Sequence, residues 1–125
     1  MALGERDVIQ IFGARKCKVT RAAQRFYSDR RVPVQFVDLG EKGLSRGELA
    51  SVARAVGGIR ALYDPAKDPT VRYAAPTEAQ LLELLVAHPG WLVTPIVRDG
   101  ARAAVGDAPD GWKELAAPPA PRDER

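Results

Sequence analysis

The sequence contains very few of the residues that crosslink small proteins. Among its 125 residues there is one cysteine, Cys17, and one histidine, His88. A single cysteine cannot form a disulfide within the chain, and no group of cysteines and histidines has the spacing of a metal site. We therefore expect a protein of a reducing compartment, the cytoplasm, that is stabilised by a hydrophobic core and holds no metal.

Long apolar runs are also absent, and acidic residues are missing from one segment. The N-terminal stretch MALGERDVIQIF is neither typical of a signal peptide nor long enough to span a membrane, so we expect no membrane role. The net charge of +3 gives no ground for direct nucleic-acid binding. Between Asp7 and Asp29 every charged residue is a cation: Arg15, Lys16, Lys18, Arg21 and Arg25. This segment is either a binding region for an anionic partner or a solvent-exposed basic helix face.

The N-terminal third has the pattern of a βαβ unit. Residues 8–12 form a short apolar run rich in β-branched side chains, which predicts a buried strand. Apolar residues at helical spacing predict a helix over 18–30, and a second strand is expected at 34–37, after Pro33. Strand, helix and strand in about thirty residues imply two parallel strands joined by a right-handed crossover.

Two helices with capping boxes follow. Ser45 and Glu48 mark the start of the first, which a Gly-Gly pair ends. Thr77 and Gln80 mark the start of the second, which ends at His-Pro-Gly. The intervening residues 59–76 contain two Asp-Pro pairs, which predict a short helical turn followed by a loop.

The last part of the chain has the pattern of a hairpin and a closing helix. A strand at Ile96 and Val97, a turn at Asp99-Gly100 and a returning strand at 101–105 are predicted. A helix with Trp112 and Leu115 on its apolar face should close the domain. We expect one monomeric domain over residues 1–116, with a helical insertion at about 45–90, and a disordered tail at 117–125, which is rich in proline and charge.

This order of elements resembles the arsenate-reductase-related (ArsC-like) family of the thioredoxin-like superfamily, which also contains the Spx regulators and the YffB-type proteins. The resemblance covers about 8–115 and rests on the segments IFGARKCKVTRAA, AHPGWLVTPIV and RDGARAAVG. It implies an α/β, thioredoxin-like (glutaredoxin-like) fold: a mixed sheet with a helical insertion between its βαβ and ββα halves. It also implies that the Thr94-Pro95 peptide is cis and lies against Cys17. An ordinary trans proline at a strand start is the alternative.

Cys17 stands where a turn enters a helix, and its surroundings predict a reactive thiol. An ordinary cysteine, with a pKa of about 8.5, is only a few per cent ionised at neutral pH. The free amide groups and dipole of a helix start lower this pKa, as do neighbouring cations, and the Thr20 hydroxyl is placed to donate to the sulfur. The alternative is that Cys17 is a small, inert core residue.

The resemblance implies monothiol redox chemistry. Thr20 carries a hydroxyl where related proteins have serine or a second cysteine, and Arg21 matches the arginine that follows the motif in the reductases. The implied catalytic residues are therefore Cys17, Thr20 and Arg21. The Cys17 thiolate would attack an oxidised substrate, and glutathione or another small thiol would resolve the product, with no bound cofactor.

The chain departs from the reductase pattern at three positions. The arginines that hold the oxyanion in the reductases correspond here to Asp64, Thr94 and Val105, so arsenate is not the expected substrate. Neighbouring arginines are candidates to replace them, and the candidate substrate- and thiol-binding residues are Lys16, Lys18, Thr94, Pro95, Arg60 and Arg102. The alternative function is a non-catalytic, Spx-like module that binds the transcription machinery. Expected protein partners are glutaredoxin or thioredoxin for the enzyme and an RNA polymerase subunit for the module.

Overall fold

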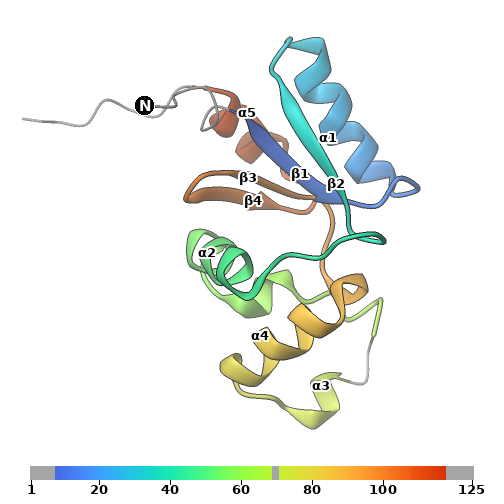
Figure 1. Ribbon diagram of the computed structural model, residues 1–125, viewed down its shortest axis with the longest axis vertical. Helices are drawn as coiled ribbons and strands as arrows, with labels where there is room; N and C mark the ends of the chain where they lie inside the picture. Colours follow the sequence, from blue (N-terminus) through green and yellow to red (C-terminus); the bar gives the residue numbers. More distant parts are fainter. Residues whose placement is uncertain (1–7, 69–70, 118–125) are drawn as a thin grey trace, which may run out of the picture.

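The computed structural model describes residues 8–68 and 71–117. Its elements follow the predicted order (Figure 1), with two additions among the described residues: the four-residue helix α3 in the segment expected to be a loop, and the short 3₁₀ helix η3 after α4. The elements are β1 (Ile9–Gly13), α1 (Lys18–Asp29), β2 (Val34–Asp38), α2 (Arg46–Val56), η2 (Ile59–Leu62), α3 (Val71–Ala74), α4 (Glu78–Ala87), η3 (Pro89–Trp91), β3 (Ile96–Asp99), β4 (Arg102–Val105) and α5 (Pro109–Ala116). The tail predicted to be disordered lies, from residue 118 on, outside the described residues.

The four strands form one mixed sheet in the order β2-β1-β3-β4. β1 and β2 are parallel, as the βαβ pattern predicts, whereas β3 runs antiparallel to β1 and β4. Phe12, near the end of β1, pairs with Ile96 at the start of β3. The turn that follows β1 and the segment that precedes β3 therefore lie at the same end of these two neighbouring strands.

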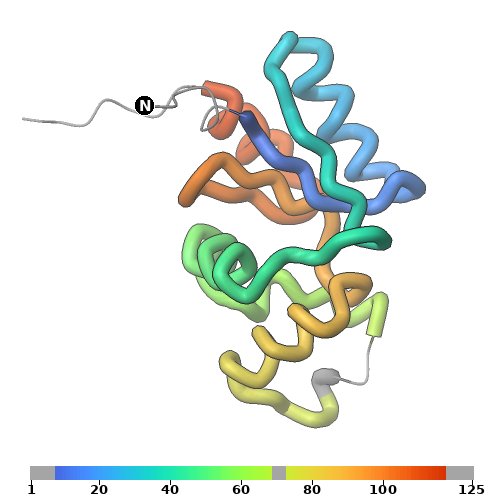
Figure 2. Tube along the Cα trace, viewed as in Figure 1, coloured from blue at the N-terminus to red at the C-terminus, as the bar shows by residue number. Residues whose placement is uncertain are grey.

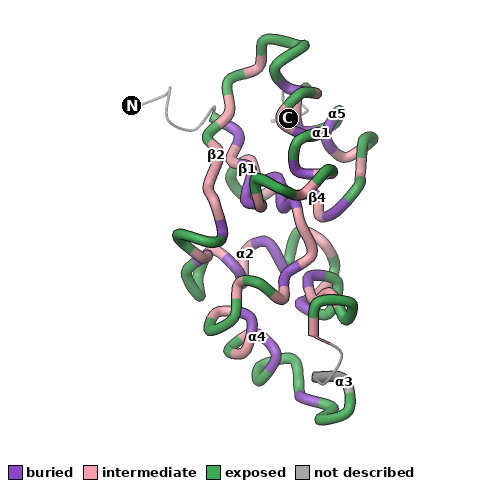
Figure 3. The backbone as a smooth tube through the Cα atoms, turned by 90° about the vertical axis from the view of Figure 1, so that its right-hand side faces the viewer, coloured by how far each residue is buried: buried purple, intermediate pink, exposed green. Residues whose placement is uncertain are grey.

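Alternate side chains of the strands enter two separate cores. Ile9, Ile11 and Val97 pack with α1 and α5 on one face of the sheet. Phe12 and Ile96 pack with α2 and α4 on the other face. The buried residues accordingly lie mainly in β1 and β3 and at intervals along the helices (Figure 3). The period-two alternation of strands thus explains why helices cover both faces of the sheet, and the helical insertion lies at one end of the molecule (Figure 2).

Local sequence signals determine both helices of the insertion. Ser45 and Glu48 form a complete capping box at the start of α2, and Thr77 and Gln80 form another at the start of α4. Gly57 ends α2 in the left-handed region, with φ of 96°, which side chains other than glycine rarely adopt. The predicted starts of α2 and α4 and the predicted end of α2 are therefore confirmed.

A buried tyrosine joins the first and last helices. Tyr27 is fully buried in α1, and its hydroxyl donates to the carbonyl oxygen of Trp112 in α5 at 2.7 Å. Burial, with the nearby Asp99 carboxylate, raises the pKa of Tyr27 well above its ordinary range, so the phenol stays protonated and remains a donor. Within the described ranges, no helix is both long and apolar enough to cross a membrane.

Candidate active site

Cys17 is the N-cap of α1, directly after the turn that leaves β1. Its backbone is extended, with φ of −76° and ψ of 122°, and its carbonyl accepts the first helical hydrogen bond from Arg21 at 3.0 Å. Its sulfur takes the place of the usual capping oxygen and accepts from the Thr20 N–H at 3.4 Å. The thiol is partly buried, so it remains within reach of solvent.

Hydrogen-bond donors converge on the sulfur and favour its ionised form. Burial raises the pKa of Cys17, but the side chains of Thr20 and Thr94 and the backbone N–H groups of Thr20 and Val19 outweigh it and lower the pKa to about 7. The neighbouring cations, which the sequence predicts to lower this pKa as well, are not among the causes. In the structure the donors account for it, as expected where a thiolate accepts several hydrogen bonds.

Thr20 is fully buried against the end of β1. Its Oγ1 makes no hydrogen bond of ordinary geometry within the described part of the chain, although it is the donor that lowers the Cys17 pKa most. A Cβ on Gly13 would stand 2.4 Å from this oxygen, so only glycine at that position leaves room for it. The packing of Thr20 against Gly13 at the end of β1 therefore holds the hydroxyl in place but gives it no hydrogen bond of ordinary geometry among the described residues.

Thr94 and Pro95 bring the second hydroxyl to the sulfur from the other side of the site. The Thr94-Pro95 peptide is cis, as the resemblance predicts, and Pro95 is buried. The Thr94 hydroxyl donates to Sγ of Cys17 at 3.3 Å. The structure thus unites the β1–α1 turn with the segment before β3, which are far apart in sequence.

The exposed cations of the turn are close to Cys17 in the chain but have different roles. Arg15 pairs with Asp38 at the end of β2 at 3.0 Å and lies over the Phe36 ring. Lys16, Lys18 and Arg21 are exposed on the turn and the first turn of α1. These three cations lie within four residues of Cys17 in the chain and remain candidates for contacting an anionic substrate.

The structure does not bring Arg60 or Arg102 to the sulfur. The Arg60 guanidinium donates to the Pro76 carbonyl at 2.9 Å, within the helical insertion. Arg102 pairs with Asp99, so it lies at the far end of β3, three residues or about 10 Å along the strand from Ile96. There its guanidinium donates to carbonyl oxygens at the end of α5.

A lysine that the sequence pattern does not single out reaches the site. Nζ of Lys67 lies 2.7 Å from the Leu92 carbonyl oxygen and 3.3 Å from Oγ1 of Thr94. Asp64, where the resemblance places an arginine, instead begins the turn that carries Lys67, since its carbonyl accepts from the Lys67 N–H at 3.0 Å. Lys67 is the only cation in the segment 61–68, next to the predicted Asp-Pro turn, and this was the signal available in the sequence.

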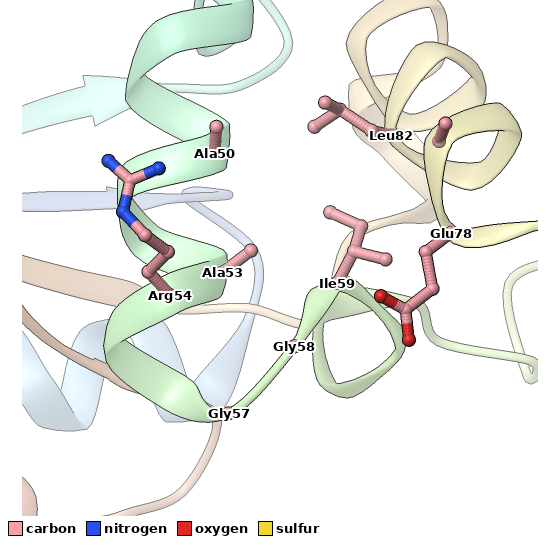
Figure 4. A pocket seen from close by; sticks show the side chains of 9 residues that line it. Ala50, Ala53, Arg54, Gly57, Gly58, Ile59, Glu78 and Leu82 are labelled. Carbon is pink, nitrogen blue, oxygen red and sulfur yellow. The ribbon is translucent and has the colours of Figure 1, made fainter.

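Two other features lie apart from the thiol. A hollow of about 540 Å³ opens between α2 and the start of α4 (Figure 4), with Arg54 and Glu78 among its otherwise small and apolar lining. His88 ends α4 and stacks on Trp91, with ring centroids 3.9 Å apart. Across residues 8–68 and 71–117, no three cysteine, histidine or acidic side chains gather in a way that could hold a metal ion.

Comparison with known proteins places this geometry in a known fold. No family model matches the chain, and no curated protein matches it by sequence. Among solved structures, an arsenate reductase from Vibrio cholerae has a TM-score of 0.76 at 19% identity, covering 86% of this chain and 97% of its own. A YFFB protein has a TM-score of 0.73 at 22% identity, covering 88% and 100%. An arsenate reductase (ArsC) related protein from Brucella melitensis has a TM-score of 0.62 at 21% identity, covering 86% and 92%. The chain therefore has the ArsC-like form of the thioredoxin-like fold, as the resemblance predicted.

Proposed function

We propose that this protein is a monothiol redox enzyme in which Cys17 is the nucleophile. The observation that supports this most strongly is that the Thr94 hydroxyl and the Thr20 N–H both donate to one partly buried sulfur at the N-terminus of α1. With a pKa of about 7, about half of the thiol is ionised at neutral pH. Thiolate is the form that attacks disulfides.

The proposed reaction is thiol–disulfide exchange with an external thiol as reductant. The Cys17 thiolate attacks one sulfur of a disulfide substrate, a bond forms between the two sulfurs, and the other half of the substrate leaves as a thiolate. A glutathione thiolate then attacks the sulfur that is bonded to Cys17, releases the Cys17 thiolate and carries away the mixed disulfide. When the substrate sulfur came from glutathione, this product is oxidised glutathione. No second cysteine exists in the chain, so resolution must come from outside it.

A disulfide fits this site better than an oxyanion does. A tetrahedral dianion needs several guanidinium forks, which the site lacks, because Arg60 and Arg102 are engaged elsewhere and Asp64 and Val105 are not basic. A disulfide needs only an activated thiolate and a donor for the departing thiolate. The exposed Lys16 and Lys18 would supply that donor and contact the carboxylates of glutathione.

The experiment is reduction of 2-hydroxyethyl disulfide by glutathione, coupled to glutathione reductase and followed by NADPH oxidation. The wild type should accelerate the reaction, whereas Cys17→Ser and wild type alkylated on its single thiol should both equal the uncatalysed rate. Mass spectrometry of the wild type treated with oxidised glutathione should show one added glutathione. If Cys17→Ser retains the wild-type rate, the proposal is wrong, and the Spx-like interaction module becomes the better hypothesis.

A further inference from the structure

The lysine that sequence reasoning missed contacts the hydroxyl that reaches the catalytic sulfur. We propose that Lys67 is a positioning residue, whose ammonium group orients the Thr94 hydroxyl so that its O–H donates to Sγ of Cys17. The proposal rests on the proposed function, because it assigns part of the activation of Cys17 to a distant loop. The contacts form one chain, 3.3 Å from Nζ to Oγ1 and 3.3 Å from Oγ1 to Sγ.

The direction of this chain follows from the chemistry of its members. An ammonium group has three N–H donors and no acceptor, so the Thr94 oxygen must accept from Lys67. The hydroxyl proton of Thr94 then points away from Lys67, and Sγ of Cys17 is the acceptor within hydrogen-bond distance. The positive charge also polarises the O–H bond and makes the hydroxyl a stronger donor. A donor fixed toward the sulfur favours the thiolate over the thiol.

The backbone holds Lys67 beside Thr94. Residues 62–64 pair with residues 91–93 through N–H···O bonds of 2.8 and 2.9 Å and an antiparallel bridge. The turn after this pairing is closed by Asp64, whose Oδ1 accepts a backbone N–H at 2.9 Å. Nζ of Lys67 is held further by the carbonyl of residue 92 at 2.7 Å, two residues before Thr94.

Other charged groups near the sulfur do not make this contact. On the β1–α1 turn, Arg15 is paired with Asp38, and Lys16 is exposed. On α1, Lys18 and Arg21 are exposed. On the insertion side, Asp64 is engaged by backbone N–H groups. Lys67 is thus the cation that the structure joins to Cys17 through a defined hydroxyl.

The test is the pH midpoint of Cys17 alkylation by iodoacetamide in a double-mutant cycle. Lys67→Met should raise the midpoint by about 0.4 to 1 pH unit, the shift that corresponds to one net hydrogen bond. Lys67→Arg, which keeps donors without an acceptor, should stay close to the wild type. Thr94→Val should itself raise the midpoint, and Lys67→Met should add no further shift in that background, because the hydroxyl that Lys67 orients is gone.

Two controls separate positioning from general effects. Lys113→Met removes an exposed lysine of α5 and should leave the midpoint unchanged. Lys67→Ala, which also has no side-chain donor, should raise the midpoint as Lys67→Met does and serves if that variant does not fold, as judged by thermal melting.

The outcomes distinguish this proposal from the proposed function. A wild-type midpoint like that of an ordinary cysteine would overturn the proposed function itself. A wild-type midpoint near 7 that Lys67→Met and Lys67→Ala leave unchanged would overturn the positioning role alone. Equal shifts from Lys67→Met in the wild-type and Thr94→Val backgrounds would show that Lys67 acts by its charge and not through Thr94, which would also overturn it.

Discussion

Replacing Thr20 with valine should make the protein more stable and its thiol less acidic. Thr20 is fully buried, and its hydroxyl has no hydrogen bond of ordinary geometry among the described residues. Burying such a hydroxyl costs about 1–3 kcal/mol, and the methyl group that replaces it adds about 0.8 kcal/mol of apolar burial. The methyl group is larger than the hydroxyl and must fit against Gly13, which offsets part of this gain. We expect Thr20→Val to be more stable by about 1 kcal/mol when the thiol is protonated.

The same substitution removes the hydroxyl that contributes most to lowering the Cys17 pKa. The alkylation midpoint of Cys17 should therefore rise from about 7 toward that of an ordinary cysteine. The Brønsted relation makes a less acidic thiolate intrinsically more nucleophilic, so the rate at high pH should rise while the rate at neutral pH falls. Thr20→Ser keeps the hydroxyl and is the matched control, so its midpoint should stay near 7. It should be less stable than the wild type, because removing the buried methyl group leaves a small cavity.

The two effects of Thr20→Val are linked through pH. The folded-state pKa of Cys17 lies below its unfolded value of about 8.5, so ionisation stabilises the wild type fully above that value. This contribution is lost as the pH falls through about 7. The variant gains less from ionisation, so its stability advantage should be largest near about pH 5.5 and shrink between about pH 7 and 8.5. Urea unfolding at several pH values measures this. A variant that is no more stable at low pH and keeps the wild-type midpoint would refute the reasoning about Thr20.

Three further predictions test the surroundings of the site. Gly13→Ala should destabilise the protein by about 1–3 kcal/mol in urea unfolding, because its Cβ would stand 2.4 Å from the buried Oγ1 of Thr20. Gly47→Ala, where the space is open, should not destabilise it in this way. Equal losses of stability in the two variants would contradict the steric explanation. Arg60→Met and Arg102→Met should leave the alkylation midpoint unchanged, and a shift from either would place it in the site after all. Tyr27→Phe should lose about 1–2 kcal/mol of stability in urea with an unchanged midpoint, because a buried 2.7 Å hydrogen bond disappears; unchanged stability would contradict this.

The parts of the fold that the sequence predicts well are those set by neighbouring residues. The capping boxes at Ser45 and Thr77 bring their own partners three residues on, so the starts of α2 and α4 follow from local chemistry. The hairpin turn, which is predicted at Asp99-Gly100 and lies one residue later at Gly100-Ala101, and the alternation along β1 are likewise local. The short helix α3 was missed because four residues carry no periodic pattern.

The candidate site was predictable where one motif carries it and not where the fold assembles it. Cys17 and Thr20 share a single helical turn, and the Thr94-Pro95 pair is recognisable from the resemblance. The contact of Lys67 with Thr94 depends on pairing between residues 62–64 and 91–93, and no local sequence pattern predicts that pairing. Arg60 is a candidate from the sequence alone because it lies close to Asp64 in the chain. In the structure its guanidinium instead donates to the Pro76 carbonyl oxygen.

The measurement that tests the central claim most directly is the rate of iodoacetamide alkylation of the wild type as a function of pH. The chain has one thiol, so the rate reports on Cys17 alone. We expect a single titration with a midpoint near 7, well below that of an ordinary cysteine. A midpoint at or above about 8.5, with slow alkylation at neutral pH, would show that the hydrogen bonds to the sulfur do not activate it and would contradict the account.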